Sequence, residues 1–166
     1  MTTVYLIRIR NFILFAMLQA LVFSRIHLFG YATVYIYLLF LLKLPRHTSC
    51  NELLIWGFLL GLTVDMFGNT PGINAAAATV LAFTRNSVLE NFIHKGNPDN
   101  LKPGVHTISW GGYMGYTIIC ILIFNVVLYL LDLFSINYPL PLLISVASST
   151  VLTMLFVVVT ECFTRK

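Results

Sequence analysis

The chain has 166 residues, of which 58% are hydrophobic and only 10% are charged, whereas soluble domains carry about 25% charged residues. This composition excludes a soluble globular domain, because too few polar side chains are present to cover a core, and it predicts an integral membrane protein. The formal net charge of +4 comes from basic residues that stand singly between apolar runs, which favours membrane orientation over nucleic-acid binding.

Six apolar runs follow one another along the chain, and we expect each to cross the membrane as a helix. They lie at about 5–24, 30–43, 52–67, 71–93, 108–131 and 137–161. A helix needs about 20 residues to cross about 30 Å of hydrocarbon, and it satisfies its own backbone in lipid. The first run resembles a signal peptide, but no small-residue cleavage site follows, so we interpret it as an uncleaved span. The predicted fold is all-α: one polytopic membrane domain over residues 1–166, a bundle of about six transmembrane helices.

The distribution of basic residues predicts the orientation of this bundle. Six spans place both termini on one side, and that side collects nine basic residues: Arg8, Arg10, Lys43, Arg46, Arg85, Lys95, Lys102, Arg165 and Lys166. The opposite side holds only Arg25. Because Lys and Arg are enriched in cytoplasmic loops, we expect both termini in the cytoplasm. The same orientation predicts Tyr31 and Tyr35 at the outer interface, and Trp56 and Trp110 at the inner one.

The third and fourth runs are predicted to pack closely. Gly57, Gly61 and Asp65 recur at a spacing of four and share one helix face. The pair of glycines forms a G-x-x-x-G pattern, which allows two membrane helices to approach each other. The fourth run carries small residues along a facing stripe, namely Ala75, Ala78, Thr79 and Ala82. Because the turn at 68–72 is very short, the two helices must pack antiparallel.

Asp65 is a carboxylate inside an apolar run, and such groups usually have a partner or a role. A charge at the bilayer centre costs roughly 2.5–3.5 kcal/mol even on a lenient scale. Three interpretations are open: a structural pin, a ligand site, or a carboxylate solvated at the outer interface. As a pin, it would accept hydrogen bonds from Asn74 or from the backbone N–H groups that open the fourth helix. We favour the pin, which predicts that Asp65→Asn is tolerated and that Asp65→Leu loosens the turn.

The fifth and sixth runs carry further polar and small residues at helical spacings. In the fifth run a single heptad-like packing seam is predicted, formed by Gly111, Gly115, Ile118, Leu122, Asn125, Tyr129 and Asp132. In the sixth run Ser145, Ser149 and Thr153 share a face. Packing between helices is the preferred interpretation of these stripes, and a ligand-lining role is the alternative.

The segment 85–94 reads RNSVLENFIH and predicts an amphipathic extension of the fourth helix at the membrane surface. Its apolar side consists of Val88, Leu89, Phe92 and Ile93, and its polar side of Arg85, Asn86, Glu90 and Asn91. Interfacial anchoring is the preferred interpretation, and contact with a cytoplasmic partner is the alternative.

Residues 57–85, GFLLGLTVDMFGNTPGINAAAATVLAFTR, resemble MreD, the rod-shape-determining membrane protein family of bacteria. The matching positions are Gly61, Asp65, Gly68, Gly72 and Asn74, and the specific match covers about a fifth of the chain. The resemblance implies a non-enzymatic scaffold in the cytoplasmic membrane. Such a scaffold binds the single-span protein MreC and works with the MreB filament and the enzymes of peptidoglycan elongation to set cell shape.

The MreD family is also similar in fold to the S components of energy-coupling-factor vitamin transporters. This similarity implies the alternative function, a substrate-binding membrane subunit. The residues that would line its pocket are Asp65, Asn74, Asn125 and Asp132.

No catalytic, cofactor or metal site is predicted. The sequence contains no H-E-x-x-H, G-x-S-x-G or P-loop, and its three cysteines have no metal-binding spacing. An intramembrane aspartyl protease needs two facing carboxylates, and the two candidates, Asp65 and Asp132, fall near the outer ends of different spans. We therefore expect no enzyme activity and no cofactor.

Overall fold

The computed structural model describes residues 2–21, 33–70, 72–93, 102–132 and 139–164. Within these ranges the chain forms helices and no strands. They are α1 (Thr2–Leu21), α2 (Leu38–Leu42), α3 (Cys50–Gly68), α4 (Ile73–Glu90), α5 (Val105–Ile108), α6 (Trp110–Asp132) and α7 (Pro139–Thr164). The prediction of an all-α fold is confirmed for these ranges.

Among the described residues, three helices are long and apolar enough to cross a membrane. They are α3, α6 and the part of α7 from Ser145 to Cys162. Length and composition therefore support three of the six predicted spans, those at 52–67, 108–131 and 137–161.

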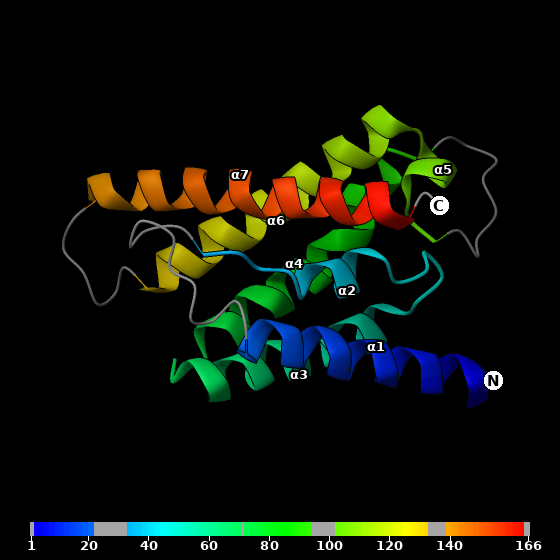
Figure 1. Ribbon diagram of the computed structural model, residues 1–166, viewed down its shortest axis with the longest axis horizontal. Coiled ribbons are helices and arrows are strands. Elements are labelled where there is room, and N and C mark those ends of the chain that lie inside the picture. The colour runs from blue at the N-terminus through cyan, green and yellow to red at the C-terminus, as the bar shows by residue number, and fades with distance from the viewer. Residues whose placement is uncertain (1, 22–32, 71, 94–101, 133–138, 165–166) are drawn as a thin grey trace.

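The long helices run side by side along the longest axis of the molecule (Figure 1). One end of the bundle, which we call the basic end, holds the start of α1, the loop 43–49, the end of α4, α5 and the end of α7. The opposite end, which we call the turn end, holds the connection at 68–72 between α3 and α4. The segments predicted to share one side of the membrane thus lie at one end of the bundle. The α3–α4 pair is the closest helix pair, α4 also packs on α6, and α6 packs on α7.

The second apolar run differs from the prediction of a helical span. Residues 33–37, which we call the extended segment, form no regular helix: residues 33–35 have no regular structure and residues 36 and 37 form a turn into the short helix Leu38–Leu42. Thr33, Val34, Tyr35, Ile36 and Tyr37 are all β-branched or aromatic, and such residues favour an extended chain. This segment passes between α1 and α3 on one side and α6 and α7 on the other (Figure 1), and residues 34–42 are buried.

Gln19 of α1 supplies part of the backbone hydrogen bonding that this extended segment lacks. Its side-chain N–H donates to the carbonyl of Val34 at 2.9 Å, and its side-chain oxygen accepts from the N–H of Ile36 at 2.9 Å. Gln19 is only 1% exposed. Non-helical backbone at membrane depth is tolerated only where protein covers it and satisfies it, as the Gln19 amide does here.

The polar stripe of α7 satisfies the other side of the same segment. Ser149 Oγ accepts from the N–H of Thr33 at 3.1 Å, and Thr153 Oγ1 accepts from the N–H of Tyr35 at 3.4 Å. Ser145, Ser149 and Thr153 are all buried, so the shared face predicted for them is confirmed. These hydroxyl groups serve the extended backbone rather than helix–helix contact alone.

The aromatic positions agree with an interfacial belt only in part. Tyr35 is buried, with its ring 5.1 Å from the ring of Phe124, so it does not present its ring to lipid as a residue of an aromatic belt would. Trp110 is exposed at the basic end, and Trp56 is half-buried. Tyr31 lies outside the described residues. Tyr35 packs inward because the segment that carries it is extended through the bundle rather than helical at its edge.

The heptad-like seam predicted on α6 is confirmed only in part, because Gly115 lies against Phe92 and Asn125 is buried, but Ile118 and Leu122 do not pack inward. The buried residues of α6 are Tyr113, Tyr116, Thr117, Cys120, Ile121, Phe124, Asn125 and Leu128, whereas Ile118 is 42% and Leu122 is 45% exposed. Gly111 is also exposed and has no atom within 4 Å of the position a Cβ would take. In a membrane, exposed isoleucine and leucine face lipid without penalty, so an apolar stripe alone does not identify the face that packs on protein.

The apolar side of the amphipathic segment after residue 85 packs against the bundle. Leu89 is fully buried, and Phe92 packs against the core. A Cβ at Gly115 would lie 2.7 Å from Phe92 Cε1, so the ring of Phe92 occupies the space that this glycine leaves on α6. The predicted helical extension is confirmed as far as Glu90. Its apolar side is covered by α6 because glycine lets the aromatic ring approach.

Candidate functional site: a pinned helical hairpin

Two glycines of α3 bring it against the backbone of α4. A Cβ at Gly57 would lie 2.9 Å from the carbonyl oxygen of Ala78 and 2.9 Å from Ala82 Cβ. A Cβ at Gly61 would lie 2.5 Å from Ala75 Cα and 2.5 Å from the carbonyl oxygen of Asn74. Both distances at Gly61 are to backbone atoms, which cannot rotate away. The close antiparallel packing predicted for this pair is therefore present.

The connection between the two helices relies on left-handed backbone at two residues. Asn69 ends α3 with φ of 53°, and its N–H donates to the carbonyl of Asp65. Gly72 precedes α4 with φ of 79°, and no atom lies within 4 Å of the position that a Cβ would take there. Glycine suits this conformation because it has no Cβ. Gly68 is exposed and lacks a positive φ, so neither space nor backbone conformation requires glycine there.

Asp65 lies at the centre of this connection and is 3% exposed. Its Oδ1 accepts hydrogen bonds from the backbone N–H of Asn74 at 3.1 Å, from Asn74 Nδ2 at 2.9 Å, and from Thr70 Oγ1. Its Oδ2 accepts from the backbone N–H of Ala75 at 2.8 Å. These are the hydrogen bonds that the structural-pin interpretation predicts. The alternative of a carboxylate solvated at the interface is contradicted by this burial.

The carboxylate of Asp65 caps α4 from a different helix. The first N–H groups of any helix lack hydrogen-bond acceptors within that helix. Gly72, which precedes α4, has no side chain that could provide an acceptor. Asp65 supplies it instead, and its negative charge lies at the positive end of the α4 dipole. Asn74 extends the arrangement, because its Oδ1 accepts from the hydroxyl of Tyr37 at 3.2 Å. The hairpin is thereby joined to the extended segment.

Substitutions of Asp65 should weaken the hairpin in a defined order. In Asp65→Asn the amide loses least when its NH₂ faces the N–H of Ala75 and its oxygen keeps the donors of Thr70 and Asn74. One contact is lost, at a cost of about 0.6 kcal/mol on average and near 2 at most for buried polar contacts in membrane bundles. Asp65→Leu loses all of them and should cost more. Melting temperature and membrane abundance of the two variants check the order. Equal stability of Asp65→Leu and wild type would contradict the role of the carboxylate as a pin.

A cavity of about 250 Å³ lies beside the hairpin at the turn end. Its lining is partly polar and includes Gln19, Thr33, Tyr35, Thr70, Asn74, Tyr129 and Asp132. Two of the four residues predicted to line a ligand pocket, Asn74 and Asp132, are therefore found here. Asp65 borders a separate shallow hollow. Asn125 is absent from the lining, and its Nδ2 donates to Thr150 Oγ1 of α7 at 2.9 Å.

Arg85 lies in a place that the sequence pattern did not predict. It was assigned to a cytoplasmic loop, yet it is 0% exposed within α4. Its Nε donates to the hydroxyl of Tyr116 at 3.1 Å, and one terminal nitrogen donates to the carbonyls of Leu42, at 3.2 Å, and Leu44. Leu42 is the last residue of α2 and Leu44 lies two residues beyond it, so the guanidinium lies at the negative end of this short helix. Position 85 falls on the same helix face as Leu81 and Leu89, a spacing that indicates burial.

Two ion pairs tie other helices together at the basic end. Arg8 of α1 pairs with Glu52 of α3. Lys43, which follows α2, pairs with Glu161 of α7 at 2.8 Å. The hydroxyl of Tyr113 also donates to Glu161, at 2.8 Å. The two basic residues were predicted only to orient the chain in the membrane, and their pairing with these glutamates was not predicted.

Comparison with protein-family models, with curated proteins and with solved structures finds no match to this chain. The resemblance to MreD therefore rests on residues 57–85, the segment that forms the pinned hairpin.

Proposed function

We propose that the chain is a membrane scaffold of the bacterial cell-elongation machinery. In this role it binds an MreC-like single-span protein in the cytoplasmic membrane, and through it acts with MreB filaments and the enzymes of peptidoglycan elongation. The proposal rests on the hydrogen bonds that the carboxylate of Asp65 accepts. In the segment that resembles MreD, this carboxylate accepts from four donors, all within the hairpin.

A carboxylate engaged in this way favours a scaffold over a cation-binding site. A cationic ligand at Asp65 would have to displace the N–H groups of Asn74 and Ala75, and those buried donors would then lack partners. The hairpin also presents a continuous apolar side away from the bundle, where Ile55, Phe58 and Met66 of α3 are exposed. Lipid or a transmembrane helix of a partner covers such a side. A hairpin with a fixed shape gives a partner helix a constant surface to pack on.

The proposed orientation places both termini and the loop after α4 in the cytoplasm. A cysteine introduced at Gly96, which lies outside the described residues, tests it. We expect Gly96→Cys to react with a membrane-impermeant thiol reagent only after the cells are permeabilised. The three native cysteines, Cys50, Cys120 and Cys162, are replaced by serine or alanine beforehand. Reaction in intact cells would contradict the orientation.

Co-purification tests the scaffold function. A tagged copy of the chain is expressed in its bacterial host together with the MreC-like protein of the same genome, and the complex is isolated in mild detergent. We expect the two proteins to co-purify in a constant ratio, and we expect depletion of the chain to make rod-shaped cells round. Normal rods after depletion, together with no MreC-like protein in the complex, would refute the proposal.

The cavity at the turn end favours a second candidate function, that of a substrate-binding subunit of a small-molecule transporter. Its volume of about 250 Å³ lies just below the roughly 300–1,000 Å³ of typical ligand pockets, and Asn74 and Asp132 offer polar groups to a bound molecule. A vitamin retained through purification and identified by mass spectrometry would support this function. A transporter ATPase in the isolated complex, in place of an MreC-like protein, would support it too.

A further inference from the structure

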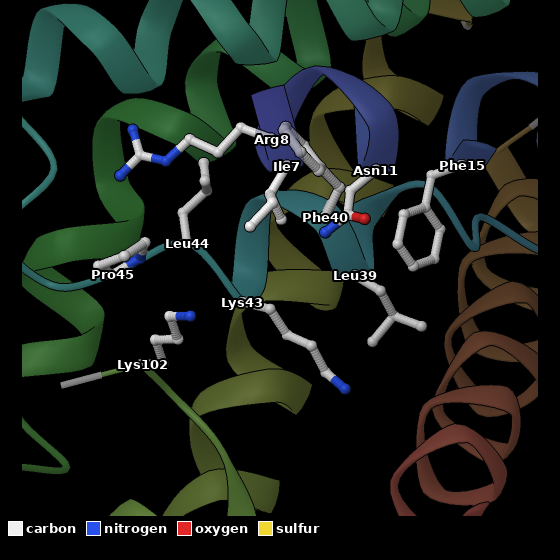
Figure 2. Close-up of a pocket in the computed structure, with 10 residues that line it drawn as sticks. All are labelled: Ile7, Arg8, Asn11, Phe15, Leu39, Phe40, Lys43, Leu44, Pro45 and Lys102. Carbon is white, nitrogen blue, oxygen red and sulfur yellow. The ribbon is translucent and has the colours of Figure 1, made fainter. Parts of the chain in front are cut away.

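A second cavity, of about 270 Å³, lies at the basic end between α1 and the segment that contains α2. Its lining combines three cationic side chains with an apolar wall, as Figure 2 shows. The cations are Arg8, Lys43 and Lys102, and the remaining lining residues are Ile7, Asn11, Phe15, Leu39, Phe40, Leu44 and Pro45. This cavity is separate from the hairpin and from the cavity at the turn end.

The charges around this cavity leave an excess of one positive charge. Arg8 is paired with Glu52, and Lys43 is paired with Glu161. Lys102 is exposed and has no ion-pair partner among the described residues. The cavity therefore complements a ligand with a single negative charge.

The wall that α1 contributes to this cavity has a cationic side chain, Arg8, at one end and an aromatic one, Phe15, at the other. Arg8 and Phe15 are seven residues apart on α1, which corresponds to about 10 Å along the helix axis. Figure 2 shows Phe15 on one side of the cavity and Arg8 and Lys102 on the other, with Lys43 extending past Leu39. Lys43 and Lys102 belong to the loops of the basic end, whereas Phe15 lies further along α1 toward the turn end. A ligand that fits has its charge at the membrane surface and its apolar part deeper.

We propose that this cavity binds an anionic phospholipid, with the phosphodiester group near Lys102, Lys43 and Arg8 and part of one acyl chain along Phe15 and Leu39. A phosphodiester lipid such as phosphatidylglycerol carries the single negative charge that the lining complements. Basic pockets between membrane helices on the cytoplasmic side bind anionic lipid headgroups. The cavity is smaller than a whole phospholipid, so the rest of the lipid lies in the surrounding bilayer.

Lipid binding to the detergent-purified full chain tests this proposal. Native mass spectrometry and melting temperature are measured with phosphatidylglycerol, with zwitterionic phosphatidylcholine, and with glycerophosphoglycerol, which has the same phosphodiester but no acyl chain. We expect phosphatidylglycerol to bind saturably at one site and to raise the melting temperature, and we expect the other two to do neither. Equal effects of the two lipids, or an equal effect of glycerophosphoglycerol, would overturn the assignment to an anionic lipid.

Lys102→Gln locates the site. The affinity of this variant for phosphatidylglycerol should be about fivefold lower than that of the wild type, because one Lys near an anionic lipid raises the affinity by about that factor. The variant should keep its melting temperature without lipid, because the Lys102 side chain is exposed. Arg10→Gln is the matched control: Arg10 is exposed on the same helix as Arg8 but does not line the cavity, so its affinity should stay unchanged. Wild-type affinity in Lys102→Gln, or an equal loss in Arg10→Gln, would refute this location.

Discussion

Replacing Gly61 with leucine should remove most of the folded protein from the membrane. Even a Cβ at this position would lie 2.5 Å from two backbone atoms of α4, a distance at which α3 and α4 must move apart. Overpacking of a well-packed interior typically costs about 1–3 kcal/mol, and we expect Gly61→Ala to lie at the upper end of this range. Gly61→Leu should exceed it, because three more carbon atoms must fit into the same contact.

The separation of the helices would also remove the cap on α4. The N–H groups of Asn74 and Ala75 reach Asp65 only while the two helices remain close, so the variant loses packing and hydrogen bonds together. Membrane abundance and melting temperature measure the loss.

Gly68→Ala is the matched control for Gly61, seven residues further along α3. Gly68 is exposed, and an added Cβ would meet only Thr70 Oγ1, at 3.5 Å. We expect Gly68→Ala to keep wild-type abundance and melting temperature. A Gly61→Leu protein that is abundant and melts like the wild type would show that α3 and α4 are not packed as described.

Replacing Arg85 with methionine should give the second large loss of stability. The guanidinium is fully buried and satisfies the carbonyls of Leu42 and Leu44 as well as the hydroxyl of Tyr116. Methionine fills similar space but donates no hydrogen bond. The carbonyl of Leu42 keeps a second donor, the hydroxyl of Tyr116 at 3.3 Å. The carbonyl of Leu44 is left without one, at a cost of about 1–3 kcal/mol.

Two further variants separate the geometry of Arg85 from its charge. Arg85→Lys keeps the charge but replaces the planar fork by a single ammonium group, so it should recover only part of the lost stability. Arg10→Gln removes an exposed arginine and should leave the melting temperature unchanged. If Arg85→Met were as stable as Arg10→Gln, the buried contacts of Arg85 would contribute nothing to the stability of the basic end.

The parts of the fold that were predictable from the sequence are those set by neighbouring residues. The contact between Asp65 and Asn74 spans nine positions, and it follows from a spacing of four in one helix together with a very short turn. The approach of Gly57 and Gly61 to the small residues of α4 depends on the same two facts. A regular helical period and a short connection leave only one way to bring these residues together.

The extended segment could not be predicted because its stability depends on residues far away in the chain. Its backbone is satisfied by Gln19, which is 15 positions from Val34, and by Thr153, which is 118 positions from Tyr35. Hydropathy alone describes residues 30–43 as one more span. The high content of β-branched and aromatic residues was the available signal for an extended chain, and the polar stripe of α7 was the signal for its partners.

Arg85 and part of the seam on α6 were misjudged for a related reason. Apolar residues are equally stable against lipid and against protein, so Ile118 and Leu122 have no hydrophobic reason to face inward. A basic residue near the end of an apolar run satisfies the rule for cytoplasmic loops whether or not it is exposed. Only the carbonyl groups at and just after the end of α2 reveal that Arg85 is held inside the bundle.

The most direct test of the central claim is the amount of MreC-like protein retained per folded molecule of the Asp65→Asn variant. If Asp65 acts as a structural pin in a scaffold, the variant should be slightly less abundant and melt at a slightly lower temperature. Each folded molecule should nevertheless retain as much partner as the wild type does. An Asp65→Asn protein with wild-type abundance and melting temperature that retains no partner would contradict the claim, because the carboxylate would then be a binding site rather than a pin.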